Sequence, residues 1–132
     1  MAKPVTLLLE RTPPGMNRRT LMTAAIIGVI GNPNCGKTTL FNALTGLRAR
    51  VGNYPGVTVE IREGHTSFAG REAVIIDLPG TYSLDAISDD ERVVTDLLAG
   101  QHPTAPVPDA IVLVADACSL SRSLMLIAQV LQ

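Results

Sequence analysis

Gly31–Thr38, with the sequence GNPNCGKT, fits the phosphate-binding pattern G-x-x-x-x-G-K-[ST] at every position. An apolar run, AAIIGVI over residues 24–30, comes directly before it. Apolar residues at helical spacing follow it over residues 37–45. Strand, loop and helix in this order form the setting in which the pattern binds phosphate. The stretch therefore predicts a nucleotide site on a P-loop fold.

The residue types in this stretch suit the chemistry of phosphate binding. Backbone N–H groups of such a loop face inward, and the positive end of the following helix adds to the attraction for an anion. Gly31 and Gly36 keep the walls of the loop free of side chains. Lys37 would reach the outer phosphates, and the Thr38 hydroxyl would complete part of a Mg²⁺ shell shared with the nucleotide.

Length and composition limit the chain to one domain. Its 132 residues are 46% apolar, which suffices for a core. The net charge is −1 without a basic cluster, so nothing indicates a nucleic-acid partner. Cys35 and Cys118 form no C-x-x-C pair, which favours reduced thiols over a disulfide framework. Cys35 is either a redox-sensitive thiol or, more often at such a position, a small side chain that the loop tolerates.

The amino-terminal part of the chain carries no clear signal. Residues 1–22 show no hydrophobic period and contain the turn-forming run PPG at 13–15. We expect a flexible extension there and a domain over residues 23–132. The apolar run from Leu21 to Ile30 has about ten residues, which is too few to span a bilayer.

Hydrophobic periodicity predicts four strands and three helices. The strands cover residues 24–30, 57–62, 73–76 and 110–115, and a turn at Ala69-Gly70 joins the second and third into an antiparallel hairpin. The helices cover residues 37–45, 88–98 and those from about 121 onward. The stretch 47–56, rich in Gly, Asn and Pro, is predicted to be a mobile loop. We expect an α/β fold with a mostly parallel sheet, one antiparallel hairpin strand and helices on both faces.

The same periodicity predicts which side of each helix is buried. The first helix would face the sheet with Leu40, Phe41 and Leu44 and end at Gly46. The second begins with the capping box at residues 88–91 and would bury Val93, Val94, Leu97 and Leu98. The last would bury one face made of Leu120, Leu124, Ile127, Ala128 and Leu131.

Three residues beyond the loop could complete the site. Asp77 ends a buried strand, at the edge where open α/β sheets bind ligands, and could hold Mg²⁺ through water. Thr58 lies where the 47–56 loop enters its strand and could also meet the metal. Gly80 could bring a backbone N–H to the γ-phosphate. As alternatives to a role in the site, Thr58 is an ordinary strand threonine and Asp77 forms the turn at the strand end.

Three motifs together resemble those of the G domain of the FeoB ferrous-iron transporters, and the resemblance extends over residues 24–132. Residues 31–42, GNPNCGKTTLFN, resemble the first GTPase motif of that family. Residues 51–60, VGNYPGVTVE, resemble its first switch. Residues 77–84, DLPGTYSL, resemble its second switch.

This resemblance implies a GTPase that uses Mg²⁺ and is stimulated by K⁺. Lys37, Thr58 and Asn34 would be the catalytic residues. Mg²⁺ would be held by Thr38, Thr58 and Asp77, and K⁺ by Asn34 with the backbone of the first switch around it. Thr81 stands where many GTPases carry a glutamine that orients water, so hydrolysis is expected to be slow. The nucleotide-binding residues would be Gly31, Asn32, Pro33, Asn34, Cys35, Gly36, Lys37, Thr38, Thr39, Gly56, Val57, Thr58, Asp77, Leu78, Pro79 and Gly80.

The resemblance also implies partners and a location. The ligands would be GTP and GDP, and the partner would be the transmembrane permease part of a FeoB-like protein. The location would be the cytoplasmic face of the bacterial inner membrane, with this chain alone soluble. The base-reading N-x-x-D motif of the family is expected beyond residue 132, so guanine rests on the resemblance. A sheet edge and a helix face are expected to be left apolar and exposed.

Two other functions stay open at this point. A nucleotide-binding fragment that does not hydrolyse would agree with Thr81 and with the missing base motif. A soluble GTPase associated with the ribosome or with tRNA would share Asn34 and Lys37. The run Tyr82-Ser83-Leu84 and the absence of a basic patch in the sequence argue against the second alternative.

Overall fold

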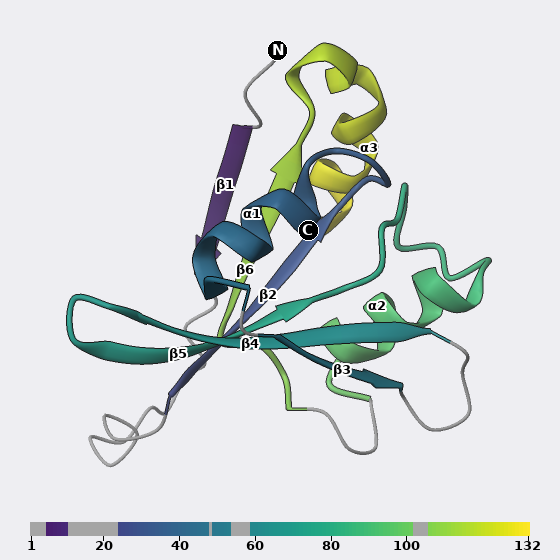
Figure 1. Cartoon of the computed structure of the whole chain (residues 1–132). Coiled ribbons are helices and arrows are strands. Elements are labelled where there is room, and N and C mark those ends of the chain that lie inside the picture. The colour runs from purple at the N-terminus through teal and green to yellow at the C-terminus, as the bar shows by residue number, and fades with distance from the viewer. Residues whose placement is uncertain (1–4, 11–23, 48, 54–58, 102–105) are drawn as a thin grey trace.

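The computed structural model describes residues 5–10, 24–47, 49–53, 59–101 and 106–132, and of residues 5–10 and Asn53 only the backbone. Within these ranges a sheet of six strands runs in the order β1-β6-β2-β5-β4-β3 (Figure 1). The strands are β1 (Val5–Glu10), β2 (Ala25–Gly31), β3 (Ala49–Asn53), β4 (Glu60–Phe68), β5 (Arg71–Asp77) and β6 (Ala110–Ala115). The same ranges contain the helices α1 (Lys37–Thr45), α2 (Asp89–Leu98) and α3 (Leu120–Val130), and a short 3₁₀ turn, η2 (Ala117–Ser119).

The centre of the sheet is parallel. β2 lies between β5 and β6 and runs parallel to both, with Val29 opposite Asp77 on one side and Val112 on the other. β4 runs antiparallel to β5, and β3 runs antiparallel to β4. The carboxyl ends of the three parallel strands therefore meet at one edge, where sheets of this type bind ligands. The predicted α/β P-loop fold, with its antiparallel hairpin strand, is confirmed.

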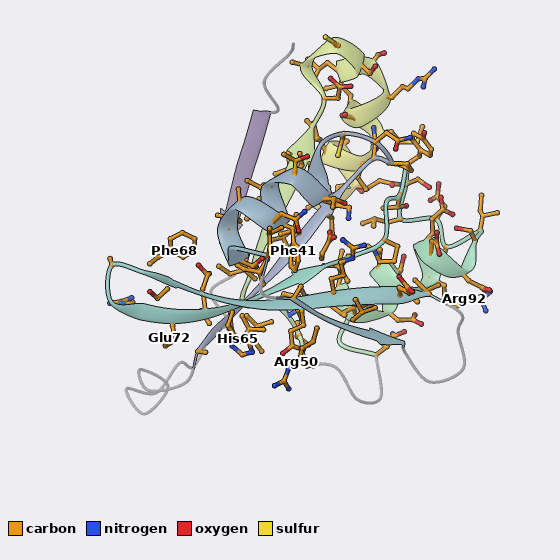
Figure 2. All side chains as sticks on the ribbon, viewed as in Figure 1. Phe41, Arg50, His65, Phe68, Glu72 and Arg92 are labelled. Carbon is orange, nitrogen blue, oxygen red and sulfur yellow. The ribbon has the colours of Figure 1, made fainter. Side chains whose placement is uncertain are left out.

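Alternating side chains of the central strands form two apolar layers. On one face Val29, Ile75 and Val112 pack with Phe41 of α1, which lies between the helix and the sheet (Figure 2). On the other face the neighbouring strand residues pack with α2 and α3, through Ile30, Ile76, Leu113, Val94 and Leu126. Helices cover both faces of the sheet, as predicted.

Several local predictions are confirmed because short-range signals determine them. α1 has the predicted bounds and ends at Gly46, whose φ of 61° is left-handed. α2 starts from a complete capping box, with Ser88 and Glu91 each accepting from the other's backbone N–H. The hairpin turns at Ala69 and Gly70, with φ of 49° and 77°. Phe68 and Glu72 flank this turn at the tip of the hairpin (Figure 2).

The sheet has more strands than predicted. β3 forms within the stretch 47–56, which was predicted to be a loop, because its backbone pairs with β4 from Ala49 opposite Gly64 to Asn53 opposite Glu60. β4 itself extends to Phe68, well beyond the predicted end at residue 62. Its second half carries polar residues on both faces, so it has no hydrophobic period, and pairing with β5 keeps it extended. Within residues 1–22, where no element was predicted, β1 pairs antiparallel with β6.

The buried face of α3 also differs from the prediction. Ser123 and Leu126 are buried, and Ile127 and Val130 pack against the core. Leu120, Leu124 and Leu131 are instead 46%, 54% and 57% exposed. Of the predicted face, Ile127 is therefore confirmed and the three leucines are not. Leucines occur on both sides of this helix, so hydrophobic spacing alone could not select the buried face. Within the described ranges, every helix is too short or too polar to traverse a bilayer.

Candidate functional site

The phosphate loop leaves β2 and enters α1 through two left-handed residues. Asn34 has φ of 62° and Gly36 has φ of 91°. Asparagine tolerates this conformation better than most residues, and glycine adopts it freely. Within the described part of the chain, no side chain caps the amino end of α1. This end of the helix, with N–H groups that no side-chain cap occupies, is therefore suitable for an anion.

The loop borders a hollow of about 580 Å³. Its lining includes eight predicted nucleotide-binding residues, from the loop, α1 and the second switch, and one residue of α2: Asn32, Pro33, Asn34, Gly36, Lys37, Thr38, Thr39, Gly80 and Asp90. Asp90 was not predicted, because in the sequence it is recognisable only as part of a capping box. The structure thus gathers the predicted loop residues around one space.

Lys37 and Asp77 meet at the edge of this site. The ammonium group of Lys37 forms an ion pair with Oδ1 of Asp77. Both side chains are largely buried, at 11% and 7% exposed. The pairing follows from the fold, because β5 lies directly beside β2 and places Asp77 opposite Val29, just before the loop. The two residues that were predicted to act on the phosphates and on the metal therefore lie in contact.

The second switch runs against the phosphate loop. The N–H of Leu78 donates to the carbonyl of Val29 at 3.1 Å, and the N–H of Thr81 donates to the carbonyl of Gly31 at 2.9 Å. Between them, Gly80 lies so close to the loop that an added Cβ would be 2.9 Å from Cα of Pro33. This position therefore requires glycine for close approach, in addition to any contact with phosphate.

Some predicted residues have side chains that point away from the hollow. Leu78 is buried in the core. Cys35 packs with Val29 and Phe41 under α1, and burial raises the pKa of its thiol. A raised pKa disfavours the reactive thiolate, which supports the interpretation of Cys35 as a small packed side chain over that of a redox thiol.

Thr81 stands at the position where the FeoB resemblance implies a missing glutamine. Its side chain is buried, at 2% exposed, and its hydroxyl donates to the carbonyl of Ser83 at 2.6 Å. The hydroxyl is therefore used inside the second switch. Predicted residues Gly56, Val57 and Thr58 of the first switch lie outside the described residues.

The residues around the hollow suit a hard divalent cation that is shared with a nucleotide. Thr38 offers a hydroxyl on the lining, and Asp77 offers a carboxylate that contacts Lys37, another lining residue. Mg²⁺ prefers such oxygen ligands and keeps several waters or phosphate oxygens, so few protein ligands are needed. Among the described residues, no group of three or more His, Cys, Asp or Glu could hold a metal. The donor set of Thr38 and Asp77 therefore fits a metal whose remaining ligands are phosphate oxygens and water.

Sequence reasoning missed a contact between the loop and α3. Nδ2 of Asn32 donates to Oγ of Ser123 at 3.2 Å, and both side chains are buried, at 4% and 1% exposed. Oδ1 of Asn32 is buried without a partner among the described residues. No local pattern indicated this contact, because Ser123 lies outside the helix face that hydrophobic spacing selected.

Comparison with known proteins places this geometry in a family. The family described as ferrous iron transport protein B matches residues 25–132. The Fe(2+) transporter FeoB of Methanocaldococcus jannaschii is 45% identical over 106 residues, which are 80% of this chain and 15% of that protein. The Fe(2+) transporter FeoB of Escherichia coli K12 is 47% identical over 111 residues, 84% of this chain and 14% of that protein. The chain spans about one seventh of the length of these relatives.

Solved structures agree with the sequence relatives. The crystal structure of the G domain of the T. maritima FeoB iron transporter matches with a TM-score of 0.71 and 44% identity, over 83% of this chain and 65% of that one. A GDP-bound variant of the S. thermophilus FeoB G domain matches with a TM-score of 0.69 and 44% identity, over 80% of this chain and 39% of that one.

Proposed function

The chain belongs to the ferrous iron transport protein B family, and from this premise we propose that it is the GTP-binding switch module of a ferrous-iron transport protein. It would hydrolyse GTP slowly and with stimulation by K⁺. The observation that carries the proposal is that Lys37, Thr38 and Gly80 line one hollow at the phosphate loop. Asp77 joins them through its ion pair with Lys37.

Each of these residues has a proposed role that follows from its position. Lys37 would move from its ion pair with Asp77 to the β- and γ-phosphate oxygens, where its positive charge would stabilise the negative charge of the nucleotide. Thr38 and Asp77, with Thr58, would hold Mg²⁺, which supplies charge neutralisation on the phosphates when bound. Gly80 would donate its N–H to the γ-phosphate, which makes the second switch a sensor of that phosphate.

Slow hydrolysis follows from the second switch. Thr81 uses its hydroxyl inside the switch and stands where other GTPases orient water with glutamine. Asn34 lies exposed on the loop and lines the hollow, which supports its proposed contact with K⁺. K⁺ held there would supply the positive charge that an arginine finger supplies in other GTPases. Lys37, Thr58 and Asn34 are the proposed catalytic residues.

The partner and the location are proposed from the relatives. Relatives of which this chain matches only 14–15% are named as Fe(2+) transporters, and several solved structures are described as cytosolic domains of FeoB. We therefore propose that this module faces the cytoplasm and acts on a membrane permease part of the same protein. GDP and GMPPNP forms among those structures support guanine as the base.

A second candidate function is that of a module that binds the nucleotide but does not hydrolyse it. The internal hydrogen bond of Thr81 favours it, because this side chain is not available to orient water. Single-turnover hydrolysis above the buffer background would exclude this candidate.

Phosphate release from GTP and from ATP, each in K⁺ and in Na⁺, tests the leading proposal. We expect release from GTP with Mg²⁺, faster in K⁺, with Asn34→Ala abolishing the difference between K⁺ and Na⁺. Lys37→Ala should remove nucleotide binding itself, as measured with fluorescent GDP. Equal rates in K⁺ and Na⁺, or equal use of ATP and GTP, would contradict the proposal.

A further inference from the structure

Leu84, the last residue of the second switch, forms hydrogen bonds with side chains of two helices. The N–H of Leu84 donates to Oε1 of Gln129 on α3 at 2.7 Å. Its carbonyl accepts from Oγ1 of Thr95 on α2 at 3.1 Å. Nε2 of Gln129 donates to Oδ1 of the next residue, Asp85, at 3.1 Å. One amide side chain thus binds two consecutive residues that lie 45 and 44 positions away in the sequence.

These contacts require both halves of the glutamine amide. The backbone N–H of Leu84 can only donate, so it needs the amide oxygen. The ionised carboxylate of Asp85 can only accept, so it needs the amide nitrogen. A glutamate at position 129 would keep the first contact but place a second negative charge against Asp85. The arrangement therefore selects an amide over a carboxylate of the same size.

The bound segment is short and is tied to the phosphate loop at its other end. Thr81 donates its N–H to the carbonyl of Gly31, so two residues separate this tie from Leu84. Gly80, which lines the hollow, comes directly before Thr81. Only three residues separate Leu84 from Gly80, so a shift of the backbone at Leu84 is expected to move Gly80 as well.

α3 is itself tied to the phosphate loop. Ser123 accepts from Asn32 of the loop, and Gln129 lies six residues later, about 9 Å along the helix axis. α3 thus contacts the phosphate loop through Ser123. Through Gln129 it also contacts Leu84, four residues after Gly80 on the other side of the hollow.

We propose that Gln129 is a positioning residue for the second switch: by fixing Leu84 and Asp85 to α3, it holds Gly80 at the phosphate loop. The inference rests on the proposed function, because only a nucleoside triphosphate carries the phosphate that Gly80 would meet. Loss of the Gln129 contacts should weaken triphosphate binding and leave diphosphate binding almost unchanged. A merely structural role would weaken both alike.

The test uses Gln129→Leu, Gln129→Glu and the double variant Gln129→Glu with Asp85→Asn. Leucine should be tolerated at 129, because this position borders a hollow of about 420 Å³ with several apolar residues in its lining. In the double variant the amide and the carboxylate exchange places, and both hydrogen bonds can form again. Gln101→Leu is the matched control, because Gln101 is exposed and outside the switch.

Affinities for fluorescent GDP and GMPPNP are measured with Mg²⁺, together with hydrogen exchange of the Leu84 amide. Both single variants should lose at least fivefold in GMPPNP affinity with GDP affinity within twofold, and the double variant should recover most of the loss. In Gln129→Leu, exchange at Leu84 should rise at least tenfold. The control should match the unmodified chain throughout.

Three results would overturn the inference: equal loss for both nucleotides, no loss for either, or a double variant as impaired as Gln129→Glu. If Gln129→Leu does not fold, the comparison of Gln129→Glu with the double variant decides by itself. An unmodified chain that binds neither nucleotide would refute the proposed function, and the inference with it, before any variant is compared.

Discussion

A methyl group added at Gly31 would have no room, and Gly31→Ala therefore tests how tightly the phosphate loop is built into the sheet. The added Cβ would lie 2.7 Å from Sγ of Cys35 and 2.7 Å from the carbonyl oxygen of Val114. Val114 is the residue opposite Gly31 in the parallel pair of β2 and β6. The substitution should therefore force the two strands apart where the loop begins.

The size of the effect follows from these distances. Ordinary contacts between carbon atoms lie at about 3.5–4.0 Å, so the neighbours must move by more than about half an ångström. Overpacking of this kind costs about 1–3 kcal/mol. The loss of glycine also restricts the unfolded chain, which returns about 0.4–1 kcal/mol. We expect a net loss of about 1–2 kcal/mol in the free energy of unfolding.

Urea unfolding measures this loss directly. With a slope of about 1–3 kcal/mol per M urea, the midpoint should fall by about 0.3–2 M. Gly52→Ala is the control, because a Cβ at Gly52 on β3 would meet no described atom within 4 Å. Removing the sulfur as well, in Gly31→Ala with Cys35→Ala, should recover only part of the loss because the Val114 carbonyl remains. Equal midpoints for Gly31→Ala and Gly52→Ala would refute the argument.

Three further outcomes are expected. Gly80→Ala places a Cβ 2.9 Å from Cα of Pro33, so the second switch should separate from the loop. GMPPNP should then bind about tenfold more weakly, with little change in the affinity for GDP. An unchanged affinity for GMPPNP would contradict this. Ser88→Ala removes the cap of α2 and should cost about 1 kcal/mol in urea unfolding without altering nucleotide affinity. A thiol reagent at pH 8 should label exposed Cys118 quickly and Cys35 slowly, because burial raises the pKa of Cys35 and lowers its thiolate fraction; equally fast labelling of both would disagree.

Short-range signals explain what the sequence predicted well. The α1 helix, the capping box of α2 and the strand β6 are each determined by residues within a few positions of one another. The phosphate loop belongs to the same class, because its eight residues carry the pattern by themselves. The contact between Lys37 and Asp77 also follows from the predicted fold, because each residue lies after or at the carboxyl end of a parallel strand, and these ends meet at one edge of the sheet.

Tertiary contacts explain what the sequence could not predict. β3 exists because the backbone of β4 offers it a free edge, and its own side chains are largely exposed. The side of α3 that is buried depends on Leu126 in the core and on Ser123 at the loop, and neither follows from spacing. The contacts of Gln129 join segments that are more than forty residues apart, for which a single sequence holds no signal. The first switch, including Thr58, stays a prediction.

The position of β2 between β5 and β6 also sets the time at which the site can form during synthesis. The phosphate loop is made before Asp77 of β5 and well before the last residue of β6, Ala115. At about 5–20 residues per second, roughly 4–15 s pass between the loop and the end of β6. β2 lacks both neighbours until β5 is made, and it lacks β6 until Ala115 is made. During this time its apolar residues are exposed, and a chaperone can bind them. Nucleotide capture by a nascent chain would therefore report that the sheet has closed.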